Sequence, residues 1–582
     1  MTTTPALQSE LPDDGLLLLL EQAEAWARQD PDEQDRATLE AEITAAREGD
    51  ATAARSLASR FSGPLAFGTA GLRAAEGPGP ARMNRVVVRR TAAGLARYLL
   101  DQVPSADGAP RPRVVVGYDA RRGSRGFALD SAAVFTAAGL ETILLPGPLP
   151  TPVLAFAVRH LEAEAGVMVT ASHNPPEDNG YKVYLGGRAT DEHGRGAQIV
   201  APADREIAAR IDHEATVDSI PLAAEGWSVA GDELLEAYRQ TALGVLDPEH
   251  TAHRDLRIVY TPLHGVGGAV FPDLLQLAGF GAPTVVTEQA EPDPAFPTVT
   301  FPNPEEPGAM DLALAAAERE GADLVIAHDP DADRCALAVQ ERDGFWRMLR
   351  GDETGVLLGH HLMQRLQQSG AAAANSVVSS RQLSRMAQAA GVEHQTTLTG
   401  FKWISRVPGL GFGYEEALGY CVDPANVRDK DGMTAALVAA ELAATLKSQG
   451  RSLLDLLDSL AVQHGLYATG QLSIRVADLS LLDAMMSRLR QAPPSSLGGQ
   501  RVIESADLAE GHRGLPPTDG VLYLTEGDSR VIIRPSGTEP KLKCYLETVL
   551  PVEDASRVAE ARVQAQQVLD RVTADVDLAL GR

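Results

Sequence analysis

The amino-acid sequence predicts an α/β protein with several domains. Apolar runs of strand length alternate with longer amphipathic stretches typical of helices, and this alternation predicts mixed or parallel sheets covered by helices. In three successive regions a predicted strand ends in a polar loop, so we expect three related α/β units. The chain has 582 residues, a length that favours about four domains.

The composition limits the classes of partner and compartment. With 44% hydrophobic and 23% charged residues, the chain can bury large cores, and no apolar stretch approaches the roughly 20 residues of a membrane-spanning helix. The net charge of −27 predicts a surface that repels nucleic acid and anionic membranes, so any phosphate site must use local positive charge. Three widely spaced cysteines indicate neither a disulfide framework nor a zinc site, and they favour the reducing cytoplasm.

The first region, residues 1–220, joins an N-terminal helical segment to βα units. Residues 1–60 are charged and rich in Ala and Leu, which predicts helices. A glycine-punctuated loop then carries Arg73, and residues 114–119 predict a buried strand that enters a polar loop. A polar stretch near residues 200–230 predicts the end of this region.

The same region contains the loop around which the rest of the chain is organised. An apolar strand at residues 166–169 ends in Thr-Ala-Ser-His-Asn-Pro-Pro, which places Ser172 and His173 at a strand end, a frequent place for chemistry in α/β sheets. Asn179-Gly180 predicts a second turn, and the next strand, which carries Lys182, is expected to begin after it. The alternative for these residues alone is an ordinary polar surface loop.

The second region, residues 221–345, predicts a cation site. A strand at 256–260 leads to a glycine-rich loop, and the long loop at 292–307 is expected to pack on another part of the protein. An apolar strand then ends in three carboxylates at alternate positions, which repel one another unless a cation lies among them. Oxygen ligands suit magnesium or calcium, and an EF-hand is excluded because its sixth and twelfth positions would be an arginine and a glutamine. A solvated acidic loop is the alternative for the three residues, Asp329, Asp331 and Asp333.

The last two regions, residues 346–460 and 461–582, carry further polar motifs. In the third region we expect a strand at 376–380, then the segments Thr-Leu-Thr-Gly-Phe-Lys and Gly-Tyr-Glu-Glu-Ala-Leu-Gly, and Lys430 before a long helix. In the fourth, a strand feeds Arg-Pro-Ser-Gly-Thr, where a guanidinium, hydroxyls and free backbone amides can bind phosphate. Only six of the 52 basic residues are lysines, so a lysine within a motif indicates a need for a compact ammonium.

Together these motifs resemble the α-D-phosphohexomutases, specifically the bacterial phosphoglucomutase branch, which also resembles phosphopentomutases. The resemblance runs from about residue 65 to residue 547 and covers the phosphoserine, metal, sugar and phosphate loops in order. It implies three related α/β domains with mixed sheets and a smaller C-terminal α+β domain, arranged around a central cleft. Two departures are Ala74, where Gly is common, and Ala417, where many members have Ser.

The resemblance also implies roles for the motif residues. Ser172 would be the phosphorylated serine, and its phosphate would bind magnesium together with Asp329, Asp331 and Asp333. The transferring phosphoryl group would be surrounded by Arg73, His173, Lys182 and Lys430. The substrate would be bound by Arg334, Thr399, Gly400 and Glu415, and its other phosphate by Arg534, Ser536, Gly537 and Thr538. The general base stays open among Lys182, Lys430 and His173.

The function that the resemblance implies is that of a phosphoglucomutase. Such an enzyme interconverts glucose 1-phosphate and glucose 6-phosphate through a phosphoserine and glucose 1,6-bisphosphate, with Mg²⁺ as cofactor. The expected partners are small sugar phosphates, without nucleic acid or membrane, and the protein is expected to be a cytoplasmic monomer or dimer. The alternatives are a phosphopentomutase or phosphomannomutase on the same scaffold, or a non-catalytic protein that binds sugar phosphates.

Overall fold

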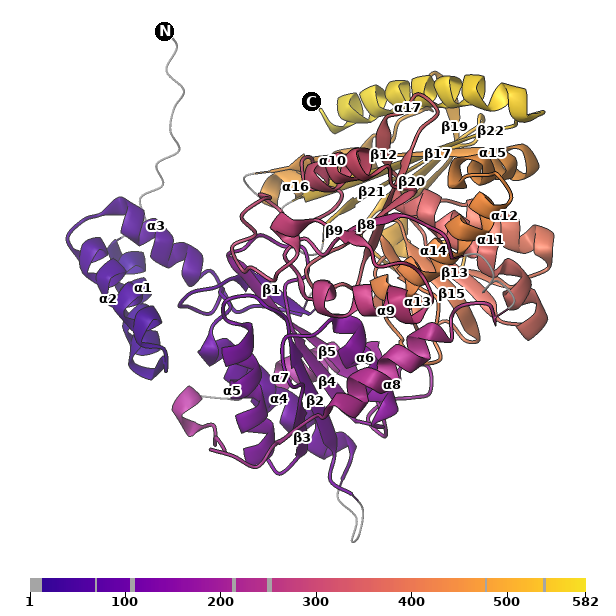
Figure 1. The fold of residues 1–582 in the computed structure, drawn as a ribbon. Coiled ribbons are helices and arrows are strands. Elements are labelled where there is room, and N and C mark those ends of the chain that lie inside the picture. The colour runs from indigo at the N-terminus through magenta and orange to yellow at the C-terminus, as the bar shows by residue number, and fades with distance from the viewer. Residues whose placement is uncertain are drawn as a thin grey trace.

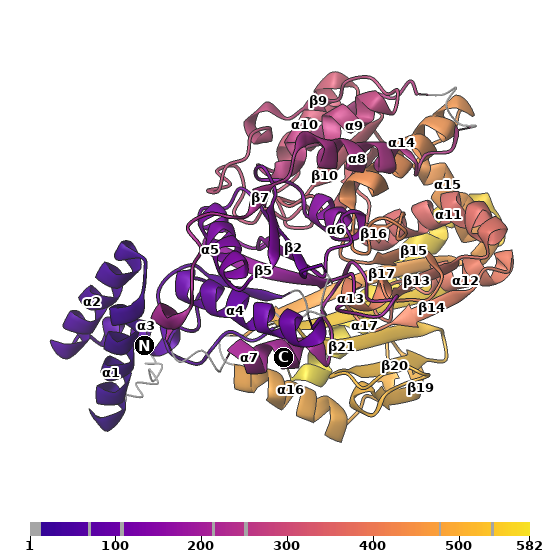
Figure 2. The same ribbon diagram turned by 90° about the horizontal axis from the view of Figure 1, so that it is seen from below.

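The computed structural model describes residues 13–67, 71–104, 110–211, 216–248, 254–476, 479–536 and 541–581. These residues form four sheets with their covering helices, shown from two directions in Figures 1 and 2. We call the units built on the sheets domains I to IV in chain order. The predicted fold class is confirmed, since three domains have mixed sheets and the last has an antiparallel sheet. No helix of the described residues is long and apolar enough to cross a membrane.

The N-terminal helices form a small bundle beside domain I, at the left of Figure 1. The predicted helices are confirmed for residues 13–60, while residues 1–12 lie outside the described part of the chain. The ring of Trp26 lies 5.6 Å from the guanidinium carbon of Arg90, and the main chain of Arg60 accepts a hydrogen bond from Ala81 N at 3.0 Å. The helices are α1 (Asp13–Gln29), α2 (Glu33–Arg47) and α3 (Ala51–Arg60).

Domain I has a mixed sheet of order β1-β5-β4-β2-β3-β7, with β6 pairing β5. Strands β2, β3, β4 and β7 are parallel, and β5 is antiparallel to β4. The strands are β1 (Leu72–Ala75), β2 (Arg113–Tyr118), β3 (Glu141–Leu144), β4 (Ala165–Val169), β5 (Asp178–Leu185), β6 (Ala197–Gln198) and β7 (Ser228–Val229). The helices are α4 (Arg85–Gln102), α5 (Ser124–Ala137), α6 (Thr151–His160) and α7 (Ala203–Ile211).

The predicted turn at Asn179-Gly180 is wrong, because both residues lie inside β5 and pair with β1. The Asn179 side chain is used for packing, since its amide donates to Glu76 Oε1 at 2.8 Å. A Cβ at Gly180 would lie 2.5 Å from the carbonyl oxygen of Thr170. The glycine therefore allows two main-chain segments to approach closely. Because glycine is also common in turns, its presence in the sequence does not distinguish the two uses.

Domain II has a sheet of order β12-β11-β10-β8-β9, in which β8, β9 and β10 are parallel. The long loop at 292–307 packs as expected, since Phe296 lies under Arg121 of domain I and Phe301 lies under Arg475 of domain IV. The strands are β8 (Ile258–Thr261), β9 (Thr284–Val285), β10 (Leu324–His328), β11 (Cys335–Gln340) and β12 (Trp346–Met348). The helices are α8 (Asp232–Leu243), α9 (Phe271–Leu277) and α10 (Asp311–Glu320).

Domain III has a sheet of order β14-β13-β15-β16. The strand predicted at 376–380 is wrong, because β13 occupies the buried alanine-rich segment before it and residues 377–380 form the turn that follows. The strands are β13 (Ala372–Ser376), β14 (His394–Thr397), β15 (Leu410–Glu415) and β16 (Gly419–Cys421). The helices are α11 (Gly351–Ser369), α12 (Gln382–Ala390), α13 (Phe401–Ile404), α14 (Gly432–Ser448) and α15 (Leu453–His464).

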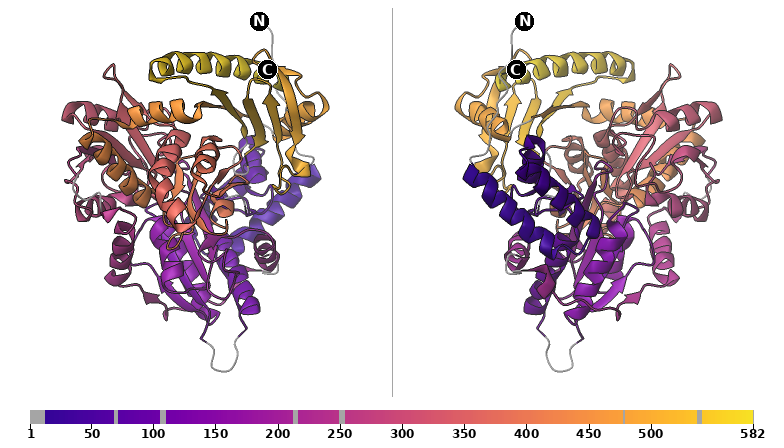
Figure 3. Two further views of the ribbon diagram at one scale, coloured as in Figure 1. Left: turned by 90° about the vertical axis from the view of Figure 1, so that its right-hand side faces the viewer. Right: turned by 90° about the vertical axis from the view of Figure 1, so that its left-hand side faces the viewer.

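Domain IV has an antiparallel sheet of order β17-β22-β21-β20-β19-β18. Figure 3 shows the long helix α17 (Val558–Leu580) lying across this sheet, and helix α16 (Leu479–Gln491) packs beside it. The strands are β17 (Leu466–Arg475), β18 (Ser496–Leu497), β19 (Gln500–Asp507), β20 (Val521–Thr525), β21 (Ser529–Pro535) and β22 (Lys541–Leu550).

Candidate active site

The site is centred on Ser172, which follows the carboxyl end of β4. Its φ of 54° lies in the left-handed region, a conformation that costs about 1–3 kcal/mol and is held by surrounding contacts. Its backbone N–H donates to Thr170 Oγ1 at 2.9 Å, and its hydroxyl donates to Asp329 Oδ2 of domain II at 2.6 Å. The loop of domain I is thus held against the acidic loop of domain II.

Arg121 holds the serine loop from behind and was not identified from the sequence. Its guanidinium donates to four carbonyl oxygens, at 2.6 Å to Ser172 and at 2.6–2.9 Å to the other three, Asn174, Pro175 and Asp178. The side chain is buried, pairs with Asp119 at 3.4 Å and lies over the ring of Phe296. Arg121 therefore fixes the main chain that carries Ser172.

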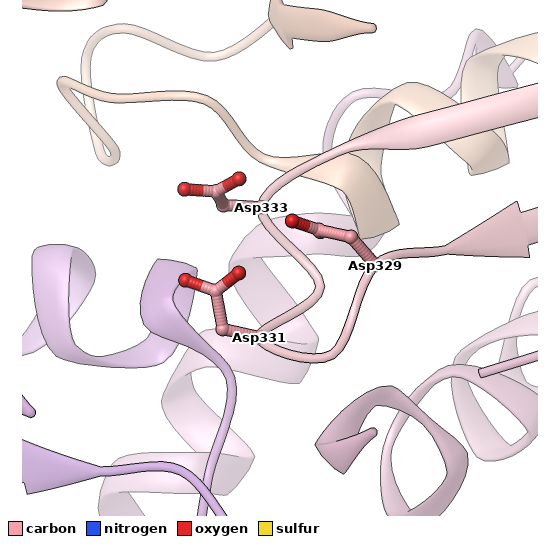
Figure 4. A group of neighbouring side chains, drawn as sticks. All are labelled: Asp329, Asp331 and Asp333. Atoms are coloured by element: carbon pink, nitrogen blue, oxygen red, sulfur yellow. The ribbon is translucent and has the colours of Figure 1, made fainter. Parts of the chain in front are cut away.

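Three carboxylates follow β10 and point toward one another, as Figure 4 shows for Asp329, Asp331 and Asp333. All three are buried, and one oxygen of each lies within 4.8 Å of the others. Burial and the two neighbouring carboxylates raise the pKa of Asp329 well above its ordinary value. Such a cluster of oxygens is the donor set that magnesium prefers.

Two ammonium groups balance part of this charge. Lys182 Nζ donates to Asp331 Oδ2 and Asp333 Oδ2, both at 2.7 Å, and Lys430 Nζ lies 3.1 Å from Asp333 Oδ2. Burial opposes ionisation of Asp331 and Asp333, but Lys182 lowers the pKa of both carboxyls. Thr151 Oγ1 also donates to Asp331 Oδ2, at 2.6 Å.

The other oxygens of these carboxylates fit a metal ion. Asp331 Oδ1 and Asp333 Oδ1 are buried and have no hydrogen-bond partner among the described residues. Buried carboxylate oxygens normally have a partner, so two unpartnered acceptors in this cluster of aspartates match the ligands of a metal ion. The donor set is therefore suited to Mg²⁺.

His173 and two arginines surround the hydroxyl of Ser172. His173 Nδ1 lies 3.3 Å from Ser172 Oγ and contacts Arg334 Nη1, which itself donates to Ser172 Oγ at 3.2 Å. Burial lowers the pKa of His173, and Arg334 and Arg73 lower it further, so the imidazole is neutral at pH 7. Arg73 Nε is buried without a partner in the described chain, so it can donate to a phosphoryl oxygen.

The predicted sugar contacts lie on domain III, next to Lys430. Glu415 ends β15 and is 7% exposed, and burial raises the pKa of its carboxyl although Lys430 opposes the shift. Thr399 and Gly400 precede α13, whose Phe401 ring lies 5.6 Å from Lys430 Nζ. The adjacent Glu416 is engaged elsewhere, because it accepts hydrogen bonds from two serine hydroxyls.

The predicted phosphate loop begins at Arg534, at the end of β21 on domain IV. Arg534 hydrogen-bonds Tyr545, and Ser536 N donates to Lys541 O at 2.8 Å. Gly537 and Thr538 lie outside the described residues. The charge of Lys543 on β22 also lowers the pKa of His173, which places this lysine near the site, and only the scarcity of lysine pointed to it.

The chain matches known proteins along most of its length. Models of the phosphoglucomutase/phosphomannomutase alpha/beta/alpha domains I, II and III and of the C-terminal domain match residues 64–217, 236–344, 350–463 and 475–565. The boundaries predicted at 220, 345 and 460 remain predictions.

Several curated relatives carry different substrate names. A "Probable phosphomannomutase" of Haemophilus influenzae is 45% identical over 85% of this chain and 96% of its own length. Human phosphopentomutase is 33% identical over 90% of each chain. A phosphoglucomutase of Staphylococcus haemolyticus is 33% identical over 86% of this chain and 93% of its own.

Solved structures share the fold. A phosphoglucomutase/phosphomannomutase family protein from Burkholderia thailandensis superposes with a TM-score of 0.63 at 20% identity, over 88% of this chain and 97% of that chain. The open form of parafusin from Paramecium gives a TM-score of 0.64 at 18% identity, over 90% and 97%.

Proposed function

Because the chain belongs to the α-D-phosphohexomutase family, we propose that it is a magnesium-dependent phosphoglucomutase that acts through a phosphorylated Ser172. The proposal rests chiefly on one contact, the hydrogen bond of 2.6 Å from Ser172 Oγ to Asp329 Oδ2. A serine hydroxyl directed at three clustered carboxylates is in place for its phosphate to share a cation with them.

The reaction consists of two phosphoryl transfers. The bond between phosphorus and Ser172 Oγ breaks, and a bond forms to a hydroxyl oxygen of glucose 1- or 6-phosphate, which gives glucose 1,6-bisphosphate. The bisphosphate then binds in the reversed orientation and returns its other phosphoryl group to Ser172. Bound Mg²⁺ would supply charge neutralisation at the phosphoryl oxygens.

The protein groups have separate tasks in this scheme. A phosphoserine carries about −1.5 to −2 charges, and Arg73, Arg334 and Lys430 surround it with positive charge. Burial opposes the charge of Lys430, but Asp333 and Asp429 raise the pKa of its ammonium, so it stays protonated. His173 is the candidate that takes the proton of the sugar hydroxyl, because its ring lies 3.3 Å from Ser172 Oγ and its lowered pKa keeps the imidazole unprotonated, although the same shift makes it a weaker base.

Sugar selection rests on few contacts, because the substrate binds in two orientations. Glu415 can accept from two neighbouring hydroxyls in either orientation, and the Arg534 loop requires only a phosphate. We expect glucose 1-phosphate to be the preferred substrate. A phosphopentomutase is the second candidate, favoured by the missing hydroxyl at Ala417 and by relatives named phosphopentomutase and phosphoribomutase.

The compartment is also a proposal. Cys335, Cys421 and Cys544 are all buried, and none of them forms a disulfide within the described residues. Cysteines that stay reduced are typical of proteins in reducing surroundings, which supports action in the cytoplasm.

A panel assay tests the proposal. Glucose, mannose and ribose 1-phosphates are compared by kcat/KM in the presence of Mg²⁺ and glucose 1,6-bisphosphate, and intact mass is measured in parallel. We expect one added phosphate that is lost in Ser172→Ala together with turnover. A pentose preference would favour the second candidate, and a protein that binds these sugars without phosphate on Ser172 would be a non-catalytic binder.

A further inference from the structure

A second pocket lies in domain I, at the edge of the sheet opposite Ser172. It has a volume of about 590 Å³ and adjoins the first residues of β2 and β3, the last turn of α6 with the residues that follow it, and the loop after β5. Strand β4 begins beside this pocket and ends next to the serine loop, so its five residues separate the two sites by about 17 Å. The pocket is therefore distinct from the candidate active site.

The pocket concentrates positive charge in a strongly acidic protein. Its lining contains five arginines and three glutamates, whereas the chain as a whole carries −27. Two of the arginines are neutralised, since Arg188 Nε donates to Glu164 at 2.7 Å and Arg113 pairs with Glu141 at 2.9 Å. A local excess of guanidinium groups in a protein with a strongly negative net charge indicates a site for an anion.

Two further guanidinium groups have no carboxylate partner among the described residues. Arg159 donates to Ala425 O at 2.9 Å and to Arg195 O at 2.6 Å, and Arg195 donates to Gly187 O at 3.0 Å. These bonds orient the two side chains and leave their charges and the remaining N–H groups of Arg195 available. Arginine N–H groups in this arrangement match the oxygens of a phosphoryl group.

Glycines form the wall beside these arginines. Gly187 has a φ of 46°, and a Cβ at Gly196 would lie 2.6 Å from Arg159 Cγ. A larger residue at position 196 would displace Arg159 from the pocket wall. The absence of side chains here preserves both the guanidinium position and the open volume.

The pocket wall is connected to the segment that carries Lys430. Gln198, two residues beyond the wall, donates to Asp429 Oδ2 at 2.7 Å, and Asp429 Oδ1 lies 3.5 Å from Lys430 Nζ. Arg428 Nη1 donates to the carbonyl oxygen of His193, at 2.8 Å, within the same pocket loop. A ligand that shifts the loop would therefore shift Lys430.

We propose that this pocket is an effector site for a small metabolite that bears phosphoryl groups. The ligand would be held by Arg159 and Arg195, and its binding would be felt at the active site through the bond between Gln198 and Asp429. Either a nucleoside diphosphate or a sugar bisphosphate offers this chemistry. The regulatory part rests on the proposed mutase function, whereas the binding part does not.

Calorimetry tests the binding part, with ADP, fructose 1,6-bisphosphate and inorganic phosphate as probes. All titrations use the Arg534→Ala background, which weakens binding at the active site. We expect at least one probe to bind with a stoichiometry of one, and Arg195→Ala to weaken it about tenfold or more, the scale of a lost charged hydrogen bond. Arg125→Ala is the matched control, because Arg125 is an exposed arginine of the same domain and forms no ion pair within the described part of the chain. Binding of ADP would identify the ligand class as nucleoside diphosphates, and binding of fructose 1,6-bisphosphate would identify it as sugar bisphosphates.

Steady-state kinetics test the regulatory part. The probe that binds should change kcat/KM of the wild-type protein by about fivefold or more, and this effect should disappear in Arg195→Ala while basal turnover is retained. Absence of binding, or binding that Arg195→Ala leaves unchanged, would overturn the site. Binding without any kinetic effect on an active mutase would overturn the effector role.

Discussion

At the residue scale, Lys430 combines two observations: lysine is scarce in this chain, and the space around this one is narrow. A Cβ at Gly419 would lie 2.3 Å from Lys430 Cδ, so the side chain runs directly along that glycine. Its ammonium faces Asp333 at 3.1 Å and Asp429 at 3.5 Å. A compact charge fits here, and a planar guanidinium needs more room.

Lys430→Arg should therefore lower kcat by tenfold or more, an expectation of about 1.4 kcal/mol or more in transition-state stabilisation. Lys447→Arg is the matched control, because Lys447 also pairs with an aspartate, Asp323, at 2.8 Å but is 39% exposed. The measurement is kcat for both variants, and thermal unfolding is measured as well, to check that both remain folded as the wild type does. If Lys430→Arg keeps most of its turnover, the argument from lysine scarcity is wrong.

Arg121 illustrates a residue whose role the sequence hid. The motif around Ser172 was visible because its side chains stand together in the chain, but Arg121 lies 51 residues earlier and bonds main-chain carbonyls. Carbonyl oxygens occur at every residue and leave no pattern. The positions of Ser172 and of the three aspartates at strand ends could be predicted, whereas this clamp required the fold.

Arg121→Met should lower kcat about tenfold to a hundredfold, because removal of charged donors to four carbonyls loosens the serine loop. KM should change less, since Arg121 is buried behind the loop. Its neighbour Arg122 is exposed and offers the control Arg122→Met. Steady-state kinetics and phosphoserine content are measured for both, and equal loss in the two variants would contradict the clamp.

At the element scale, strands that consist of a strongly apolar run were predicted to within a few residues of their observed bounds. The two wrong predictions have physical causes. The strand expected at 376–380 lies earlier, because β13 is made largely of alanines, which are also typical of helices. Asn179-Gly180 has the composition of a turn, but it serves the close pairing of β1 and β5. At both places small residues allow close packing within a strand, although the same residue types are also typical of a helix or a turn.

The start of α11 provides a pH-dependent element. Burial raises the pKa of Asp352 to about 7, although Ser380 N donates to its carboxylate at 2.6 Å. Between its ordinary value of 3.8 and this raised pKa, the folded protein holds a proton that the unfolded chain releases. Stability contributed at this position therefore falls as the pH rises from about 4 to 7.

Asp352→Asn should remove this component of the pH dependence. The unfolding midpoint of the variant, measured relative to that of the wild type, should therefore be higher at pH 8 than at pH 5. Asparagine keeps an oxygen that can accept from Ser380 N and from Tyr414 OH, which donates at 3.1 Å in the wild type. Unfolding midpoints across that pH range are the measurement, with the exposed Asp343→Asn as control. Parallel curves for wild type and Asp352→Asn would exclude the raised pKa.

At the scale of the whole molecule, the site exists only because the domains meet. Ser172 of domain I bonds Asp329 of domain II, and Lys430 of domain III reaches Asp333. The order of the motifs allowed the prediction that they converge, but the contacts between domains could not be predicted, since they join residues far apart in the chain. Domain IV, which carries Arg534, is joined to domain III by a buried carboxylate.

That carboxylate is Glu547, which is 1% exposed. It accepts from Arg381 Nε at 2.5 Å and lies 3.5 Å from Arg530 Nη2. Burial alone would raise its pKa, but Arg530 and Arg381 hold the pKa below its ordinary value. Arg530 in turn donates to Val377 O at 2.9 Å, across the interface between domains III and IV.

Glu547→Gln should leave the buried guanidinium of Arg530 without its counter-charge, whereas Arg381 is 30% exposed and keeps its pair with Asp528. The loss for a broken buried pair is about 3–5 kcal/mol. Because the interface positions the Arg534 loop, we expect KM for the sugar phosphate to rise more than kcat falls, and the first thermal transition to occur at a lower temperature. Asp528→Asn is the control, since Asp528 also pairs with Arg381, at 2.7 Å, but is 52% exposed. An exposed pair contributes about 0–1 kcal/mol, so its loss should be small. If both variants behave alike, the buried carboxylate does not set the position of domain IV.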